Sequence, residues 1–348
     1  MVIESHGNLL QANADALVNT VNTVGVMGKG IALQFKQAYP HNFDVYRRAC
    51  ERGEFKPGRM LVVETGQLQP RYIINFPTKR HWRGKARLAD IDAGLPALVA
   101  AVRKYEIRSI AVPPLGCGNG GLRWSDVRPR IERAFADVPD VQVFLYPPEG
   151  TPAAATMPVA TTPPRMTTAR AILIHAARAY RALEFDLKLT LLEMQKLAYF
   201  LQAAGEGSLR LKFVAGTYGP YAENLYHALL RMEGHFIRGL GAGSRSPDVE
   251  ITILSEALPI AAEALRVNGE AHARADRVVS LIEGFETPFG MELLATVHWV
   301  ARQEPEAKTD LELAVAEVQR WSTRKKSLLR QHHITAAWRR LREQGWLN

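Results

Sequence analysis

Hydrophobic positions in the first 150 residues follow two periods that alternate along the chain. Short runs of mainly β-branched and aliphatic residues are separated by longer segments in which apolar residues recur every three or four positions. The short runs are typical of buried strands, and the longer segments are typical of amphipathic helices. The predicted strands cover residues 2–4, 16–21, 60–64, 72–75, 109–113 and 142–146. The predicted helices cover residues 30–38, 43–52, 89–105 and 125–136, the last with Ser125 as N-cap. This alternation predicts an α/β fold with helices on both faces of a sheet.

From residue 167 onward the helical period dominates. Two short β-like pieces, 211–215 and 249–254, are expected to pair with each other. The predicted helices cover residues 169–183, 191–204, 221–231, 255–267, 270–285, 288–302 and 310–320. Between the two patterns, residues 149–166 are rich in Pro, Ala and Thr and carry almost no charge, which is typical of an extended linker. The chain is therefore divided into an α/β domain at 1–148, a linker at 149–166 and a mainly helical domain at 167–348.

Composition narrows the class of protein. The chain has 348 residues, 47% of them hydrophobic, but no uninterrupted apolar run of about 18 residues, so no membrane span is expected. No signal-peptide pattern is visible at the start. Only Cys50 and Cys117 occur, which excludes a disulfide framework and fits a reducing, cytoplasmic location.

The net charge of +9 is unevenly distributed. Residues 1–150 contain 20 Lys and Arg against 14 Asp and Glu, residues 151–318 contain 16 against 20, and residues 319–348 contain 8 against 1. The two basic blocks are consistent with a nucleic-acid partner. The acidic middle block suggests a surface whose carboxylates could occupy the basic groove of a nucleic-acid-binding protein in place of phosphates. The basic helix near the C-terminus either contacts nucleic acid or forms a solvated face.

Three glycine-containing or basic loops follow predicted strands. The first contains Gly25, Gly28 and Gly30, the second covers 76–85, and the third covers 115–122 with four glycines. Glycine-rich turns before helices let backbone N–H groups approach an anion, and ligands of such sheets bind beyond the carboxyl ends of the strands. The pattern is neither a P-loop nor a GxGxxG fingerprint, so the predicted phosphate-containing ligand need not be ATP or NAD.

The motifs at 7–10 (Gly-Asn-Leu-Leu), 15–22 (Asp-Ala-Leu-Val-Asn-Thr-Val-Asn), 28–32 (Gly-Lys-Gly-Ile-Ala) and 113–118 (Pro-Pro-Leu-Gly-Cys-Gly) together resemble a macrodomain. The resemblance covers about residues 1–148 and implies a three-layer α/β/α module that binds ADP-ribose. The segment 76–82 resembles macrodomains of the DarG antitoxin type. Such proteins remove ADP-ribose that a DarT toxin places on thymidine bases of single-stranded DNA, and need no cofactor or metal.

This resemblance implies roles for named residues. Asn8 and Asp15 are equally well explained as turn residues, and Cys117, without a His or Asp partner, is expected to pack rather than to react. Asn22 would hydrogen-bond a ribose hydroxyl. The residues expected to bind ADP-ribose are Asn8, Asp15, Asn22, Gly25, Val26, Met27, Gly28, Gly116, Cys117, Gly118 and Asn119.

Lys79 is the catalytic candidate that the resemblance implies. A lysine amine can attack C1″ of the ribose or transfer a proton there, if burial and the neighbouring Arg80 and Arg83 lower its pKa. The alternative is a solvated lysine that screens phosphate charge. Some relatives carry an Asp in the third loop, where this chain has 119–121 (Asn-Gly-Gly). His81 is the substitute candidate for that acid, and a backbone- or DNA-bound histidine is its alternative.

The second loop also interleaves cations with an aromatic ring, as single-stranded DNA binding requires. A solvated basic loop is the alternative. The residues expected to contact DNA are Arg80, His81, Trp82, Arg83 and Lys85.

In the second half, the motifs 192–202 and 217–221 (Thr-Tyr-Gly-Pro-Tyr) resemble SocA-like (Panacea) antitoxin domains. The resemblance implies that this half binds the DarT toxin. The aromatics Tyr199 and Phe200 are expected to pack in the core. No His, Cys or acid set with metal or catalytic spacing is visible there, so we expect binding rather than catalysis. Two alternatives remain for the whole chain: a reader of ADP-ribose without turnover, and a hydrolase of ADP-ribosylated protein.

Overall fold

The computed structural model describes residues 1–148, 150, 152, 156–183, 188–241, 245–266 and 268–348. One compact unit comprises Met1–Thr162, and the other comprises Pro163–Leu240 with Arg245–Asn348. Residues 149, 151 and 153–155 of the predicted linker lie outside the described residues. Its described part is attached to the first unit: Asn8 Nδ2 donates to the carbonyl of Thr156 at 3.1 Å, and the Ala160 N–H donates to the carbonyl of Gln37 at 2.8 Å.

The first unit is built on a six-stranded sheet in the order β1-β6-β5-β2-β4-β3. Its strands are β1 (Val2–Glu4), β2 (Ala16–Val21), β3 (Leu61–Glu64), β4 (Tyr72–Pro77), β5 (Ser109–Val112) and β6 (Gln142–Leu145). Neighbouring strands are parallel except for β3 and β4, which are antiparallel. Because the carboxyl ends of the five parallel strands meet at one edge, the loops that follow them gather there.

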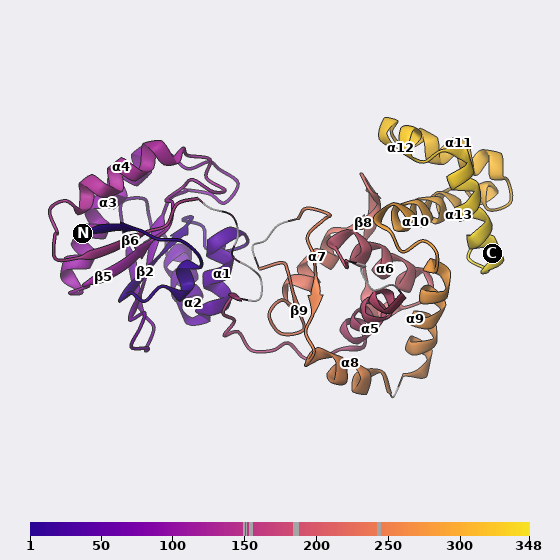
Figure 1. Ribbon diagram of the computed structural model, residues 1–348, viewed down its shortest axis with the longest axis horizontal. Coiled ribbons are helices and arrows are strands. Elements are labelled where there is room, and N and C mark those ends of the chain that lie inside the picture. The colour runs from indigo at the N-terminus through magenta and orange to yellow at the C-terminus, as the bar shows by residue number, and fades with distance from the viewer. Residues whose placement is uncertain (149, 151, 153–155, 184–187, 242–244, 267) are drawn as a thin grey trace. The chain divides into compact units, whose positions relative to one another are not determined.

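Helices cover both faces of this sheet (Figure 1). They are α1 (Gly30–Ala38), α2 (Pro40–Glu51), α3 (Leu88–Lys104) and α4 (Trp124–Phe135), with a 3-10 turn at Leu9–Gln11. Alternate residues of the strands point to opposite faces. Val18 and Ile74 pack with α3 and α4, whereas Leu17 and Ile73 pack with α1. The predicted three-layer α/β/α arrangement is confirmed.

Two predicted helix starts are wrong by a few residues. Helix α2 begins at Pro40 rather than at residue 43, because proline is tolerated in the first turn, where no N–H partner is needed. Helix α4 begins at Trp124 with Arg123 at the N-cap position, so Ser125 lies inside the first turn and caps nothing.

The second unit is mainly helical and has one large core. Its helices are α5 (Thr168–Leu183), α6 (Leu191–Ala203), α7 (Glu223–Leu230), α8 (Ala257–Arg266), α9 (Gly269–Ile282), α10 (Pro288–Gln303), α11 (Leu311–Arg320), α12 (Thr323–Leu328) and α13 (Gln331–Glu343), with 3-10 turns at Gly207–Leu209 and Pro305–Lys308. Tyr199 and Phe200 are buried in that core, which confirms their predicted packing role. The basic C-terminal helix α13 buries Ile334, Ala337 and Leu341, so its apolar face belongs to the core.

The predicted pairing of 211–215 with 249–254 is wrong. Strand β7 (Phe213–Gly216) pairs with β8 (Gly219–Ala222), and β9 (Ile237–Arg238) pairs with β10 (Thr252–Ile253). The local hairpin forms because the two-residue turn between Gly216 and Gly219 is tight and Gly219 has a φ of +90°. Residue 221, predicted to start a helix, therefore lies in β8.

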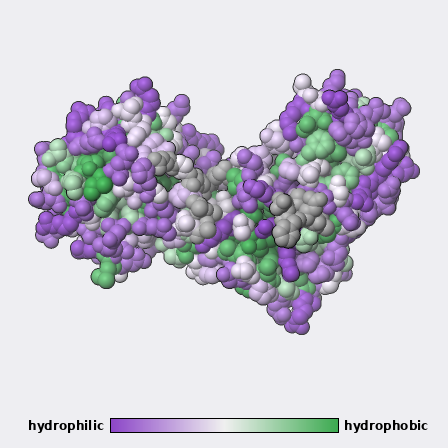
Figure 2. Space-filling model, viewed as in Figure 1, coloured by the Kyte–Doolittle hydropathy of each residue, from purple (hydrophilic) through white to green (hydrophobic). Residues whose placement is uncertain are grey.

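The visible surface of both units is mostly hydrophilic, with several hydrophobic areas (Figure 2). Exposed large apolar side chains include Leu68 in the first unit and Val214 and Tyr218 in the second. None of the helices within the described residues combines the length and the apolar character needed to cross a membrane.

Candidate active site

The three loops predicted from the sequence meet at the carboxyl edge of the sheet. Thr23 Oγ1, after β2, donates to the carbonyl of Arg80, after β4, at 2.7 Å. Lys79 Nζ donates to the carbonyl of Asn119 in the loop after β5. A Cβ on Gly30 would lie 2.9 Å from Asn119 Nδ2, so the first and third loops are also in contact. The arrangement forms one site from three segments that are distant in sequence.

Asn22 shapes the first loop. Its side chain is buried, its Oδ1 accepts from the N–H groups of Val24 at 3.0 Å and Val26 at 3.4 Å, and its Nδ2 donates to the carbonyl of Val26 at 2.5 Å. Tyr46 Oη donates to the Asn22 carbonyl at 2.9 Å. The amide predicted to contact a ribose is thus engaged in holding the loop, whose left-handed residue is Gly25 with φ +80°.

The rest of the first loop offers mainly backbone. Met27 is buried, and its sulfur lies 3.8 Å from Asn19 Nδ2, so its side chain points into the core. Val26 exposes 38% of its surface, and Gly28 adds no side chain. Helix α1 then begins at Gly30 without a side-chain cap. Its first-turn N–H groups and its positive dipole end are therefore available to an anion.

The third loop is folded by its own backbone. The N–H groups of Cys117, Gly121 and Leu122 donate to the carbonyls of residues 114, 118 and 116, each at about 3 Å. In contrast, the N–H groups of Gly118, Asn119 and 120 have no acceptor among the residues that the structure describes. Three adjacent free donors of this kind form a typical cradle for phosphate oxygens.

Close packing explains two of the glycines. Gly116 has a φ of +72°, and a Cβ on Gly120 would lie only 2.1 Å from the Gly116 carbonyl oxygen. Cys117 is half-buried, and burial, followed by the nearby Asp126, raises the pKa of its thiol to about 11. The thiol stays protonated at neutral pH, which agrees with a packing role and not with a nucleophile.

Lys79 lies two residues beyond the end of β4, and its ammonium reaches the third loop. Burial lowers the pKa of its half-buried ammonium below the usual range. Arg80, expected to help lower that pKa, instead pairs with the buried Asp90 at 3.1 Å. No carboxylate pairs with Lys79 in the described part of the chain, so the shift has burial as its cause.

The second loop continues into an exposed basic and aromatic surface. Trp82 exposes 46% of its surface, its ring stacks with His81 at a centroid distance of 5.6 Å, and the Arg83 guanidinium lies 4.5 Å from the same ring. Lys85 is exposed nearby in sequence. His81 Nδ1 accepts from the Arg83 N–H at 3.2 Å, whereas Lys79 Nζ donates to the carbonyl of Asn119, so the predicted role of His81 as a proton-transfer partner has no support from this geometry.

Two predicted ligands of ADP-ribose are engaged elsewhere. Asp15 lies at the amino end of β2, the edge opposite the glycine loops, and its carboxylate accepts from the N–H groups of Arg108 at 2.9 Å and Ser109 at 3.0 Å. It fixes the start of β5, and its position does not support a ligand contact. Asn8 lies on the correct edge, but its Oδ1 caps the turn at Leu10 and its Nδ2 binds residue 156.

The sequence reasoning missed how the two motifs of the second unit fit together. The Gln195 side chain makes two hydrogen bonds with the backbone of Ala222, at 2.9 and 3.0 Å, as a neighbouring strand would. Lys196 Nζ donates to the carbonyl of Pro220 at 2.9 Å. Helix α6 therefore holds the β7–β8 hairpin through its polar side chains. In the sequence, this role was indicated by the presence of the polar residues Gln195 and Lys196 within a mainly apolar helix.

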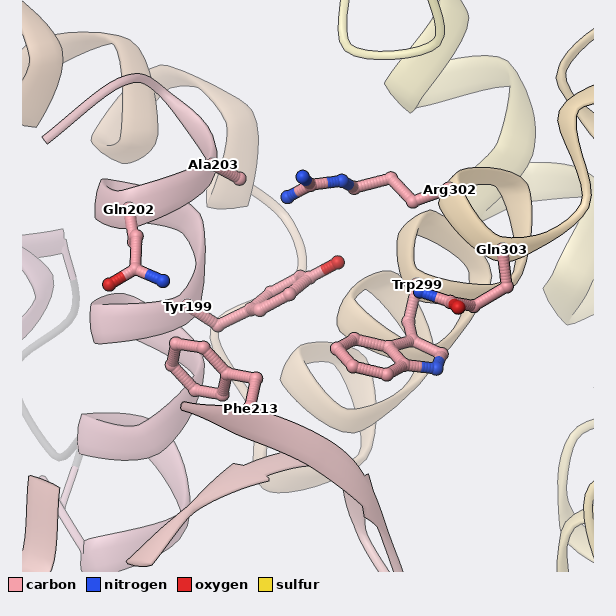
Figure 3. Close-up of a pocket in the computed structure, with 7 residues that line it drawn as sticks. All are labelled: Tyr199, Gln202, Ala203, Phe213, Trp299, Arg302 and Gln303. Atoms are coloured by element: carbon pink, nitrogen blue, oxygen red, sulfur yellow. The ribbon is translucent and has the colours of Figure 1, made fainter. Parts of the chain in front are cut away.

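A pocket of about 220 Å³ lies beside this hairpin. Figure 3 shows Tyr199, Phe213 and Trp299 around it, with the Arg302 side chain extending toward Ala203. Tyr199 Oη lies 2.8 Å from His298 Nδ1. Gln202 and Gln303 also line the pocket, but the Gln202 amide is engaged with the backbone of residue 211. The pocket thus offers aromatic surface and one cation.

Comparisons with known proteins give a consistent result. The family model described as Macro domain matches residues 18–131. A Thermus aquaticus protein named DNA ADP-ribosyl glycohydrolase is 47% identical over 327 residues, which cover 94% of this chain and 89% of that protein. A Thermosipho africanus protein named DNA ADP-ribosyl transferase-DNA ADP-ribosyl glycohydrolase fusion protein is 35% identical and covers 40% of each chain. The solved macrodomain of Mycobacterium tuberculosis DarG is 58% identical over 43% of this chain and 99% of that chain, with a TM-score of 0.42.

Proposed function

The chain belongs to the family of DNA ADP-ribosyl glycohydrolases, and on that premise we propose that its first unit removes ADP-ribose from thymidine bases of single-stranded DNA. In this reaction the N-glycosidic bond between the base and C1″ breaks, water supplies the hydroxyl at C1″, and the base takes up a proton. The observation that carries the proposal is the position of Lys79, which follows β4 at the carboxyl edge of the sheet and whose ammonium contacts the glycine-rich third loop.

The diphosphate of ADP-ribose is assigned to the free backbone donors. Gly118 and Asn119 and the first turn of α1 lie at the same edge of the sheet, and their N–H groups have no acceptor there among the described residues. The loop held by Asn22, with Gly25 and Gly28, is assigned to the distal ribose. Backbone recognition of this kind needs no metal, and ADP-ribose would remain bound there as product.

Lys79 is assigned to the reacting carbon. Burial lowers its pKa, which raises the fraction of neutral amine at neutral pH. A neutral amine at C1″ either attacks the carbon, forming a covalent adduct that water then hydrolyses, or transfers a proton. After attack and loss of the base, opening of the ribose ring gives a Schiff base between Lys79 and C1″, which borohydride reduces to a stable secondary amine. The proton-transfer route gives no such adduct, so reduction during turnover distinguishes the two.

The DNA strand is assigned to the exposed part of the second loop. Trp82 supplies a stacking face, and Arg83 and Lys85 supply charge for phosphates. Arg80 contributes less than the sequence suggested, because Asp90 already neutralises it.

The deciding experiment compares Lys79→Ala with Lys85→Ala on ADP-ribosylated single-stranded DNA and, separately, on an ADP-ribosylated acidic protein. We expect Lys79→Ala to abolish release of ADP-ribose from DNA while calorimetry still detects ADP-ribose binding. Lys85→Ala should keep its maximal rate and weaken DNA binding. Normal turnover by Lys79→Ala would reject the catalytic assignment, and faster release from protein than from DNA would reject the substrate.

We further infer that the second unit binds a DarT-type transferase. The Thermosipho africanus relative carries transferase and glycohydrolase names in one fusion protein, which supports a functional pairing. The hairpin β7–β8, whose Phe213 lines the aromatic pocket, exposes Val214 and Tyr218. The idea that acidic side chains of this unit imitate DNA phosphates has weaker support, because some of them pair with neighbouring arginines, as Glu263 does with Arg266.

This inference is tested with full-length Lys79→Ala, which separates blocking of the transferase from erasure of its product. The variant should bind the transferase and reduce modification of single-stranded DNA. Adding Val214→Glu and Tyr218→Glu should remove this protection. Leu68→Glu, a change at an exposed apolar side chain of the first unit, is the matched control. If the hairpin variant still reduced modification of the DNA, the transferase would have to bind at another surface of the protein.

A further inference from the structure

Three potential metal ligands from two helices of the second unit meet at its surface. His175 is on α5, and His272 and Asp276 are on α9, one helical turn apart. Their ligand atoms all lie within 4.8 Å of one another. His175 Nε2 is 3.9 Å from Asp276 Oδ1, and His272 Nε2 is 3.9 Å from Asp276 Oδ2. Neither distance is that of a hydrogen bond, so the three groups converge without bonding one another directly.

We propose that His175, His272 and Asp276 form a site for a divalent transition-metal ion of the zinc class. Two imidazole nitrogens and one carboxylate oxygen form a donor set typical of Zn²⁺ and unlike the all-oxygen sets of Mg²⁺ and Ca²⁺. With bonds of about 2.0–2.1 Å, tetrahedral Zn²⁺ places its ligand atoms about 3.4 Å apart. The two His–Asp separations of 3.9 Å need to close by about half an ångström. All the ligand atoms lie within 4.8 Å of one another, so no separation needs to close by more than about 1.4 Å, which is within reach of side-chain rotations.

The two histidine rings lie close enough together to share one ion. The two rings have centroids 4.4 Å apart and are tilted by 52°, so two positively charged imidazoles would repel each other at this distance. The neutral imidazole is the form in which histidine binds metals. The side chains of His272 and Asp276 are more than half exposed, so an ion can enter from solvent, and a water is the fourth ligand.

A bound ion would join two core helices. Helices α5 and α9 both contribute to the main core of this unit, but they belong to segments about a hundred residues apart in sequence. A metal that binds the folded arrangement and not the separated segments stabilises it by mass action. A bound ion would therefore cross-link two helices of the second unit. This inference does not depend on whether that unit binds a transferase.

The same chain supplies a matched control. His227 and Glu223 on α7 have the same one-turn spacing, with His227 Nε2 3.6 Å from Glu223 Oε1. No third ligand joins them among the described residues, and Arg245 pairs with the same carboxylate. If spacing on one helix were sufficient, this pair would bind zinc as well as the proposed triad does.

The test uses tag-free, chelator-treated full-length protein titrated with Zn²⁺ by calorimetry and with Co²⁺ by visible absorption. We expect one ion per chain, tetrahedral Co²⁺ bands and a melting temperature roughly 5–10 °C higher at a hundredfold excess over Kd. His272→Ala and the isosteric Asp276→Asn should each weaken binding by more than about tenfold and remove the thermal shift. His227→Ala should change neither readout.

The tandem His332 and His333, whose rings are 3.9 Å apart, is the competing site on this chain. Loss of zinc binding in the double variant His332→Ala, His333→Ala, with binding retained in His272→Ala, would overturn the assignment. Absence of any zinc or cobalt uptake by the unaltered protein would overturn it as well.

Discussion

The two units of this protein place lysines in opposite kinds of environment. In the first unit, Lys79 is half-buried at the edge of a sheet, has no carboxylate partner among the described residues and touches a loop carbonyl. In the second, Lys196 and Lys325 are fully buried and each is held by the fold: Lys196 by the Pro220 carbonyl, and Lys325 by Glu292 at 2.8 Å. All three have a pKa lowered by burial.

The comparison teaches that a depressed lysine pKa does not identify a catalytic group. Lys196 has the larger shift, yet its ammonium is enclosed in the core and fixes a hairpin. Lys79 is only partly buried, and it contacts the third loop, whose N–H groups at residues 118–120 have no acceptor among the described residues, so a substrate can reach it. A catalytic lysine is distinguished from a structural one by its accessibility to substrate and by the ligand-binding groups beside it, more than by the size of its pKa shift.

The largest effect is expected at Glu292, the centre of the buried ion network. Burial alone would raise the pKa of this carboxyl, but hydrogen bonds from Arg324 and Lys325 outweigh it and keep the carboxylate ionised. Glu292→Ala leaves Lys325 buried without its partner and should lower the free energy of unfolding by about 3–5 kcal/mol. Glu223→Ala, at an exposed ion pair with Arg245, should cost less than about 1 kcal/mol. Urea unfolding of both variants measures the difference, and equal losses would contradict the contrast drawn here.

Next in size is the pH dependence that Lys196 imposes on stability. Burial, then repulsion from Lys325, lowers its pKa to about 7. Between that value and the ordinary pKa of an unfolded lysine, the unfolded state binds more protons, so the free energy of unfolding rises with pH by up to about 1.4 kcal/mol per unit. Lys196→Met should lose this rise between pH 7 and 10. Lys79→Met, at a half-buried position, should change the slope much less. Parallel pH profiles for the unaltered protein and Lys196→Met would refute the assignment.

A third test concerns the backbone cradle of the first unit. A Cβ at Gly120 would overlap the Gly116 carbonyl at 2.1 Å, whereas one at Gly118 would meet nothing within 4 Å. Gly120→Ala should distort the loop and weaken ADP-ribose binding by roughly ten- to a hundredfold. Gly118→Ala should bind ADP-ribose nearly as the unaltered protein does. Calorimetry with ADP-ribose compares the two, and similar affinities would show that loop geometry does not control binding.

The smallest expected effect is at the exposed aromatics. Trp82→Ala should weaken binding of single-stranded DNA by about 1 kcal/mol, the low end for one stacked base because the ring is half exposed, and leave binding of free ADP-ribose unchanged. Tyr218→Ala, at an exposed ring of the second unit that Arg324 covers at 4.7 Å, should leave DNA binding unchanged. Fluorescence anisotropy with a labelled oligonucleotide measures both. If both variants lost DNA affinity equally, both units would contribute to DNA binding.

Sequence periodicity alone determined most of the first unit. The strands 2–4 and 16–21 and the helix 30–38 agree with the structure at both ends, because period-2 and period-3.6 apolar patterns are local properties of the chain. The glycine loops were also predictable, since each follows a strand and parallel strands place their carboxyl ends together. Local sequence patterns were therefore sufficient to predict at which edge of the sheet the site lies.

Tertiary structure decided which polar groups remain available there. Asp15 and Asn22 look alike in sequence as short polar residues next to β2, yet one fixes the opposite edge of the sheet and the other is engaged inside a loop. Likewise, the meeting of His175 with His272 and Asp276 depends on how α5 packs on α9. Hydrogen-bond saturation and long-range packing are properties of the folded chain, so no local pattern of residues encodes them.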